Sequence, residues 1–288
     1  MSPERPTGGP WPNDASAAIT VTFDNMGEAA DINRGLWPDD QPIGSHYSVV
    51  RMLPKFLALA KRYDIHVTYF AESWNLGVYP DAIKSIAEAG HEVAWHAWQH
   101  EAWSKECKDE QDERGNFERS FEAMTPGGSI HGERTLKMCR EFGLGYISPA
   151  AQEGAVVDVD GGKDSIVVLP FWWSTVDAYY YMESFGKLRV LKGVLREDAQ
   201  GPDVLVEALV RQIDKTIKKG GFLSLLFHPF LNDNDERLQA METVLQHLAK
   251  RRDESKTWLA TCREVEQWVR AHPDVLGSDP IWDNSSWR

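Results

Sequence analysis

The chain has 288 residues, 42% of them hydrophobic and 26% charged, and a formal net charge of −13 at pH 7. These are ordinary globular proportions, and the negative charge, with KRR at 250–252 as the densest basic run, argues against nucleic acid or an anionic membrane as a partner. Cys107, Cys139 and Cys262 are odd in number and lack C-x-x-C spacing, so we expect neither a disulfide framework nor a cysteine zinc site.

The N-terminal stretch MSPERPTGGPWPNDAS is rich in Pro and Gly and lacks the basic start and apolar run of a signal peptide. No window reaches the roughly 18 apolar residues that a membrane-spanning helix needs. We therefore predict an extended arm over residues 1–17, one domain over residues 18–288, and a cytoplasmic protein without a membrane partner.

From residue 18 onward, apolar runs of strand length alternate with amphipathic segments of helix length. The predicted strands are 18–23, 65–70, 92–96, 145–148, 165–170, 222–227 and 257–261. The predicted helices lie within 48–63, at 80–89, near 110–123 and 133–142, and at 203–219, 235–249 and 262–271. This alternation is typical of βαβ units and indicates a parallel sheet.

With about seven or eight parallel strands, we predict an α/β fold of the distorted (β/α)7-8 barrel type, similar to a TIM barrel. The active site of such a barrel lies at the C-terminal ends of its strands. An open doubly wound sheet is the alternative, but no G-x-G-x-x-G follows the first strand.

Polar residues gather just after several predicted strands, where a barrel would bring them together. They are Asp24 and Asn25, His96 and His100 in HAWQH, Asp177 after LPFWWSTV, and His228 in FHPF. Two histidines four apart can present both imidazoles on one side of a helical turn, which suits a divalent metal such as zinc. A pair of hydrogen-bonded surface imidazoles is the other interpretation of the same spacing.

The segments VTFDN, HVTYFAE, EAGHEVAWHAWQHE and LLFHPF resemble the polysaccharide deacetylase family, the NodB homology or chitooligosaccharide deacetylase type. The resemblance covers most of residues 18–270 in the family's order. It implies a distorted barrel of seven or eight strands, as the periodicity does. The family also includes metal-independent hydrolases and hydrolases that cleave imides or allantoin.

The resemblance implies a role for each polar residue at the strand ends. Asp24 takes the position of the catalytic base, Asn25 that of a metal ligand, His96 and His100 those of the metal histidines, and His228 that of the general acid. Asp177 is placed to orient His228, although it would also suit a helix N-cap.

Two positions depart from the family pattern. Asn25 puts a neutral amide where the family has a carboxylate ligand. This leaves three options: a weakly held metal, Asp24 as a replacement ligand, or no metal. Met124, in MTPGG, stands where the family has an arginine that orients the base, and Arg134 is either a substitute or a residue with surface contacts.

Several tryptophans flank these positions, and indole faces stack well on sugar rings or flat heterocycles. Trp98, Trp172 and Trp173 are candidates for substrate binding, whereas core packing is the alternative for these and for Trp95 and Trp103. Glu28 and His131 are further polar candidates near the site, and simple solvent exposure would also explain them.

We therefore expect a hydrolase that cleaves a C–N bond of a soluble amide, N-acetylated or cyclic imide substrate, using a divalent metal, with zinc as first choice. The alternatives are a catalytically silent or metal-independent relative that acts as a binding protein, and an O-acetyl esterase using the same site. The expected partner is a small or sugar-derived molecule, and related proteins suggest a homo-oligomer.

Overall fold

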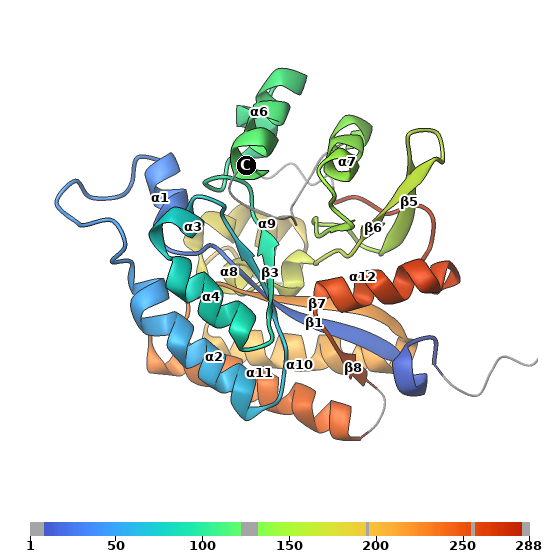
Figure 1. The fold of residues 1–288 in the computed structure, drawn as a ribbon. Helices are drawn as coiled ribbons and strands as arrows, with labels where there is room; N and C mark the ends of the chain where they lie inside the picture. The colour runs from blue at the N-terminus through green and yellow to red at the C-terminus, as the bar shows by residue number, and fades with distance from the viewer. Residues whose placement is uncertain (1–8, 122–131, 194–195, 255–256, 284–288) are drawn as a thin grey trace, which may run out of the picture.

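The computed structural model describes residues 9–121, 132–193, 196–254 and 257–283. Figure 1 shows helices packed around a central sheet, with β1 and β7 running side by side through its middle. The strands are β1 (Ala17–Asp24), β2 (Thr68–Ala71), β3 (Glu92–Trp95), β4 (Tyr146–Ile147), β5 (Ala155–Val159), β6 (Asp164–Val168), β7 (Gly221–Phe227) and β8 (Thr257–Leu259).

The main sheet has five parallel strands in the order β3-β2-β1-β7, with β8 paired to the N-terminal half of β1. Asp24 is level with Phe70 of β2, and Phe23 is level with Phe227 of β7. The residues that follow β1, β2, β3 and β7 therefore meet at one edge of the sheet. The prediction of an α/β fold built on a parallel sheet is confirmed.

The remaining wall is a second sheet in the order β4-β6-β5. β4 runs parallel to β6, whereas β5 runs antiparallel to it. The sequence analysis missed β5. Its hairpin turn contains Asp160, Gly161 and Gly162, all with positive φ, and this Asp-Gly-Gly run is a hairpin signal that the search for βαβ units passed over.

The longer helices agree with the predicted segments to within a few residues, except that α11 extends four residues further. They are α2 (Leu53–Arg62), α4 (Pro80–Glu88), α6 (Glu110–Phe121), α7 (Gly132–Glu141), α10 (Pro202–Lys219), α11 (Asp235–Asp253) and α12 (Cys262–Ala271). A π-helical segment, Ser48–Met52, leads into α2 just before Pro54. The shorter helices are α1 (Ala29–Asn33), α3 (Asn75–Val78), α5 (Trp103–Glu106), α8 (Asp177–Tyr181) and α9 (Gly186–Leu191).

The core forms because β1 is apolar or β-branched along nearly its whole length. Its first seven residues are buried, and only Asp24 at its end is partly exposed. Helices α2, α10 and α11 lie along one side of the sheet, where α10 and α11 pack against each other (Figure 1). A buried strand thus holds the acid at its end in a fixed place.

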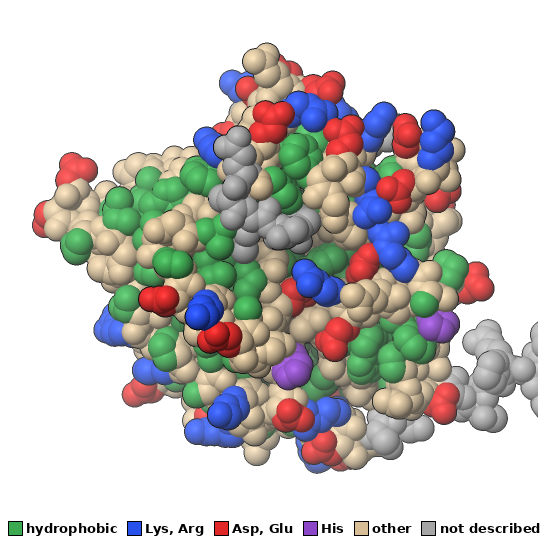
Figure 2. Space-filling model, viewed as in Figure 1, with side chains coloured by type: hydrophobic (Ala, Val, Ile, Leu, Met, Phe, Trp, Pro, Cys, Tyr) green, Lys and Arg blue, Asp and Glu red, His purple; other side chains and the backbone are tan. Residues whose placement is uncertain are grey.

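The predicted N-terminal boundary needs a correction, because part of the expected arm is folded. Trp11 is only 2% exposed, its ring centroid lies 6.2 Å from that of Trp258, and Ala15 is also buried. None of the helices in the described ranges is long and apolar enough to cross a bilayer. On the face drawn in Figure 2, Lys and Arg side chains alternate with Asp and Glu, so that face carries no continuous basic patch.

Candidate active site

Asp24 lies at the edge of the sheet where the polar residues were predicted to meet. Its Oδ2 is 3.6 Å from Nε2 of His96, and its Oδ1 has no hydrogen-bond partner among the described residues. Burial raises the pKa of Asp24 to about 7, since the opposing effect of His228 is smaller. A carboxylate in this state can take up a proton near neutral pH.

His96 and His100 do come together, but not on a helical turn as predicted. His96 continues β3 by donating its backbone N–H to Ala71, and the following turn has positive φ at Ala97 and His100. The two rings meet edge to face, with their centroids 4.8 Å apart. Residues other than glycine are strained in the left-handed region, and such backbone strain is common at functional sites.

His228 is held by a buried carboxylate. Asp177, the first residue of α8, is fully buried, and its Oδ1 lies 2.6 Å from Nδ1 of His228. Its Oδ2 accepts from the backbone N–H of His228 at 2.7 Å and from Asn232 at 2.6 Å. Burial lowers the pKa of His228, but the Asp177 carboxylate, with a smaller contribution from Asp24, outweighs burial and raises that pKa above its ordinary value.

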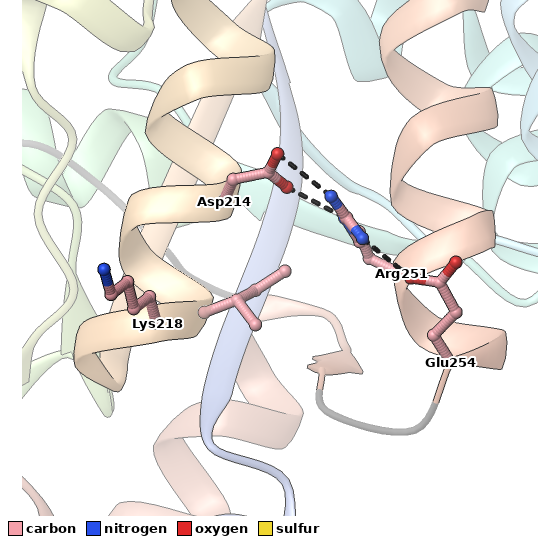
Figure 3. A pocket seen from close by; sticks show the side chains of 5 residues that line it. Asp214, Lys218, Arg251 and Glu254 are labelled. Atoms are coloured by element: carbon pink, nitrogen blue, oxygen red, sulfur yellow. Dashed lines mark hydrogen bonds and ion pairs between the residues drawn. The ribbon is translucent and has the colours of Figure 1, made fainter.

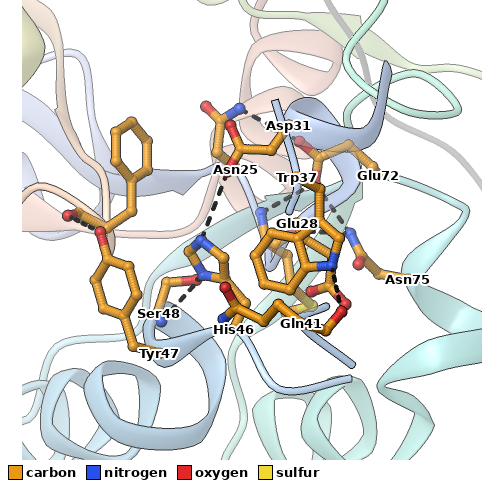
Figure 4. Close-up of polar contacts among 12 residues, drawn as sticks. Asn25, Glu28, Asp31, Trp37, Gln41, His46, Tyr47, Ser48, Glu72 and Asn75 are labelled. Carbon is orange, nitrogen blue, oxygen red and sulfur yellow. Dashed lines mark hydrogen bonds and ion pairs between the residues drawn. The ribbon is translucent and has the colours of Figure 1, made fainter. Parts of the chain in front are cut away.

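Asn25 faces a buried acid that the sequence analysis did not select. Its side-chain amide lies 3.4 Å from Oε1 of Glu72, whose Oε2 accepts from the backbone N–H of Met26 at 2.9 Å and from Asn75 at 3.1 Å (Figure 4). Burial raises the pKa of Glu72 to about 8. Glu72 follows β2 directly, so an inspection of every strand end would have found it.

Glu28 is not a solvent-exposed side chain, because it is completely buried. It accepts a hydrogen bond from the Tyr79 hydroxyl and another from the backbone N–H of Gly44, at 2.6 Å. Tyr79 in turn accepts from the backbone N–H of His46. The His46 ring contacts that of Trp37 (Figure 4). Glu28 therefore anchors the loop beside the site.

The aromatic residues divide into core and surface sets. Trp95 and Trp103 pack in a buried cluster, which fits the core interpretation. Trp98, Trp172 and Trp173 are partly exposed. Trp172 and Trp173 border a surface hollow with Gln152, and Trp98 lies beneath the Arg119 guanidinium at 5.3 Å.

The predicted metal ligands do not form a three-ligand site as they are arranged. Asn25 is directed to Glu72, and Arg34 lies 2.9 Å from Nδ1 of His100. Among the described residues, no group of three or more His, Cys, Asp or Glu side chains is placed to hold a metal ion. The buried Nε2 of His96 has no hydrogen-bond partner within the described part of the chain, but beside Asp24 it supplies only one histidine of the expected pair.

Met124 stands at the position of the family's arginine, and Arg134 is the candidate substitute. Met124 and His131 lie outside the described residues. Arg134 donates to Glu113 at 2.6 Å, in agreement with the interpretation that it makes structural contacts.

A further pocket lies away from this edge of the sheet. Figure 3 shows both carboxylate oxygens of Asp214 of α10 accepting from Nε and Nη2 of Arg251 of α11, beside Lys218 and Glu254. Because α10 ends at Lys219 and leads into the start of β7, this pocket is near the opposite end of the strands from His228. It is not part of the candidate active site.

Comparison with known proteins finds similarity to polysaccharide deacetylases in part of the sequence, and similarity of fold to several solved structures. The family model for polysaccharide deacetylase matches residues 13–126. A peptidoglycan deacetylase of Helicobacter pylori is 30% identical over 88 residues, which are 31% of this chain and 27% of that protein. The matched part thus spans about a quarter of that relative's length.

Solved structures resemble the chain over almost its whole length. A candidate polysaccharide deacetylase from Mycobacterium smegmatis has a TM-score of 0.75 and 24% identity, with 96% of each chain covered. Puue allantoinase has a TM-score of 0.72 and 19% identity, covering 92% of this chain and 94% of that one. At these identities the likeness establishes the fold. The chain therefore carries the polysaccharide deacetylase sequence pattern in residues 13–126 and has that family's barrel-like α/β fold.

Proposed function

We propose that the protein hydrolyses a C–N bond in an amide, N-acetyl or cyclic imide group of a small or sugar-derived substrate. The observation that carries this proposal is the placement of two groups at neighbouring strands. Asp24 lies at the end of β1, and His228, which is paired with Asp177, directly follows β7. Their surroundings raise the pKa of both groups, which suits one to accept a proton and the other to donate one near neutral pH.

Asp24 is the proposed general base. With its pKa raised to about 7, a substantial fraction of Asp24 is ionised at neutral pH, and this form can accept a proton from water as the water attacks the carbonyl carbon. Its raised pKa makes it a stronger base than an ordinary carboxylate. Its place at the end of a buried strand keeps its position fixed.

His228 is the proposed general acid. Asp177 accepts the Nδ1–H hydrogen bond, so Nε2 is the ring nitrogen that exchanges a proton. An amide nitrogen is a poor leaving group unless it is protonated as the C–N bond breaks. The buried Asp177 favours the protonated ring that this step needs.

The family generally uses a divalent metal, and the sequence-based prediction was zinc. Because the predicted ligands do not fit such an ion in their present arrangement, we derive no step through a metal. Elemental analysis of the purified protein is the direct check, and about one zinc per chain would show that the ligands rearrange around it.

Partly exposed Trp98, Trp172 and Trp173 favour a substrate with a flat or sugar ring. The names of the similar proteins, a peptidoglycan deacetylase and an allantoinase, span the same substrate range. An O-acetyl ester would demand less of His228, since an alcohol leaves more readily than an amine. We also propose a cytoplasmic location and a homo-oligomer. Mass photometry of the purified chain tests the oligomeric state.

The test is a substrate panel of N-acetylated sugars, N-acyl amino acids, cyclic imides and O-acetyl sugars. Asp24→Asn and His228→Gln should each lower kcat/KM by about 10²-fold or more, the range for a lost general base or acid. Asp64→Asn and His66→Gln are matched controls, because both side chains are exposed near the start of β2. Full activity in either site variant would overturn the assigned roles, and no turnover by the wild type on any class would favour a silent binding protein.

A further inference from the structure

Arg34 makes an unusual contact with one of the two site histidines. It follows helix α1, and its Nη2 lies 2.9 Å from Nδ1 of His100. Within the described ranges, Arg34 forms no ion pair with a carboxylate, although the chain as a whole is acidic. The guanidinium is therefore directed to an imidazole rather than to a counter-charge.

The donor chemistry of this contact fixes the tautomer of His100. A guanidinium has five N–H donors and no acceptor, so Nδ1 of His100 must supply the lone pair. A neutral imidazole has one N–H, which then lies on Nε2. Neither ring nitrogen then has a lone pair to give to a metal ion.

This arrangement is the reverse of the usual environment of a metal-ligating histidine. Such a histidine donates its second N–H to a carboxylate, a carbonyl or water, which fixes the lone pair on the nitrogen that binds the metal. Here a cation faces the second nitrogen of His100, and the Asn25 amide faces Glu72. Two of the three predicted ligands thus point to hydrogen bonding rather than to coordination.

We propose that Arg34 is a positioning residue that holds His100 as the Nε2–H tautomer, so that His100 serves as a neutral hydrogen-bond donor to the substrate carbonyl oxygen. Fixed donors aimed at the oxygen that becomes negative are an effective way to stabilise an acyl-transfer transition state, and a neutral imidazole can serve as one. The part that concerns the carbonyl oxygen rests on the proposed hydrolysis. The tautomer of His100 and its effect on metal binding do not depend on that hydrolysis.

The tautomer is tested directly by long-range 1H–15N correlation spectra of protein labelled with 15N-histidine, with the His100 signals assigned from His100→Gln. The wild type should show His100 protonated at Nε2, and Arg34→Met should show a mixture or the other tautomer. Arg34→Lys, which keeps a cationic donor, should restore the wild-type pattern. An Nδ1–H tautomer in the wild type would overturn the proposal.

Metal affinity gives a second readout that does not depend on turnover. In titrations with cobalt(II) alone, Arg34→Met should bind about 10- to 100-fold more tightly than the wild type, the range found when groups around a metal ligand are changed. Adding His100→Gln to Arg34→Met should abolish the gain. Arg211→Met, an exposed arginine on α10, is the matched control and should not differ from the wild type. Equal affinity in wild type and Arg34→Met would contradict the proposal.

Activity measurements then distinguish the roles of Arg34 and His100 from the proposed hydrolysis, on which the donor role of His100 rests. If the wild type is active, Arg34→Met should lower kcat more than it raises KM, and Arg34→Lys should recover part of kcat. Unchanged kcat in Arg34→Met, together with the expected spectra, would overturn the donor role of His100 alone. If Arg34→Met does not fold, as judged by circular dichroism, Arg34→Leu replaces it in every comparison. A wild type that turns over no substrate would refute the proposed function while the spectra and titrations still decide the tautomer.

Discussion

Asp24 and His228 show how position decides the behaviour of an ordinary side chain. Burial raises the pKa of Asp24, and a carboxylate held at 2.6 Å raises the pKa of His228 against the effect of burial. Both effects act on residues that strand ends bring together from positions far apart in the sequence. Activity and stability should therefore both depend on pH.

Replacing Asp24 by Asn should change how stability depends on pH. The folded pKa of about 7 is above the unfolded value of about 3.9, so the stability contributed by the protonated acid is present below pH 4 and lost as pH rises through 7. The Asp24→Asn variant has no acid at this position and therefore does not lose this stability as the pH rises. Relative to the wild type, its free energy of unfolding should therefore rise between pH 5 and pH 8, by on the order of 3 kcal/mol.

Urea unfolding at several pH values measures this difference. Asp64→Asn is the control, since that side chain is 89% exposed and its replacement should give a difference that does not vary with pH. A flat difference for Asp24→Asn would show that Asp24 is not held as a buried acid.

Replacing Asp177 by Asn should move the whole pH profile of kcat/KM to lower pH. Without the carboxylate, His228 loses the main charge that opposes burial, so its pKa falls and the acid form is lost at a lower pH. Asp177 also raises the pKa of Asp24, so the base form should appear earlier too. A uniform loss of rate with an unmoved profile would indicate that Asp177 only supports the fold.

At the scale of helices and strands, the periodic pattern of apolar residues predicted the elements that local sequence determines. The parallel strands and the longer helices follow from apolar runs and amphipathic periods, and so do the ends at which Asp24, His96 and His228 lie. β5 was missed because an antiparallel hairpin interrupts the βαβ pattern. The H-x-x-x-H spacing predicts a helical turn at 96–100, whereas the structure has a turn with positive φ at Ala97 and His100, because a spacing of four does not distinguish the two.

Contacts between distant segments could not be predicted in this way. Arg34 meets His100 across 66 positions, and Glu72 meets Asn25 across 47. No local pattern encodes either contact, since each arises only when the sheet places its strand ends side by side. The donor arrangement that argues against a ready metal site was accordingly visible only in three dimensions.

Glu72→Ala should destabilise the junction of β1 and β2. The variant leaves the backbone N–H of Met26 and the amide of Asn75 without their carboxylate acceptor in a buried place. At about 1–3 kcal/mol for each unpaired donor, we expect a loss of roughly 2–6 kcal/mol in the free energy of unfolding. Glu72→Gln keeps one acceptor oxygen and is the matched control. Urea unfolding should place it between the wild type and Glu72→Ala, and equal losses for both would contradict the hydrogen-bond explanation.

For the molecule as a whole, the last described segment ties the second sheet to the rest of the barrel. The carbonyl of Ile281 accepts from the backbone N–H of Gln152 at 2.7 Å, and Trp282 forms a β-bridge with Ala151. The Trp282 side chain packs against the buried cluster that includes Trp95. Gln152 in turn accepts a hydrogen bond from the Trp172 indole, so this segment also supports an aromatic wall of the surface hollow.

Trp282→Ala should therefore loosen both the fold and this wall. Losing a partly buried indole should cost about 1–3 kcal/mol in the free energy of unfolding. Hydrogen–deuterium exchange should rise in residues 150–156, whose backbone pairs with this segment. Ile281→Ala is the matched control, because the neighbouring side chain is 49% exposed and its removal should change neither measurement appreciably. If the two variants behave alike, the stability of the second sheet does not depend on the Trp282 side chain, and the segment is held by its backbone pairing alone.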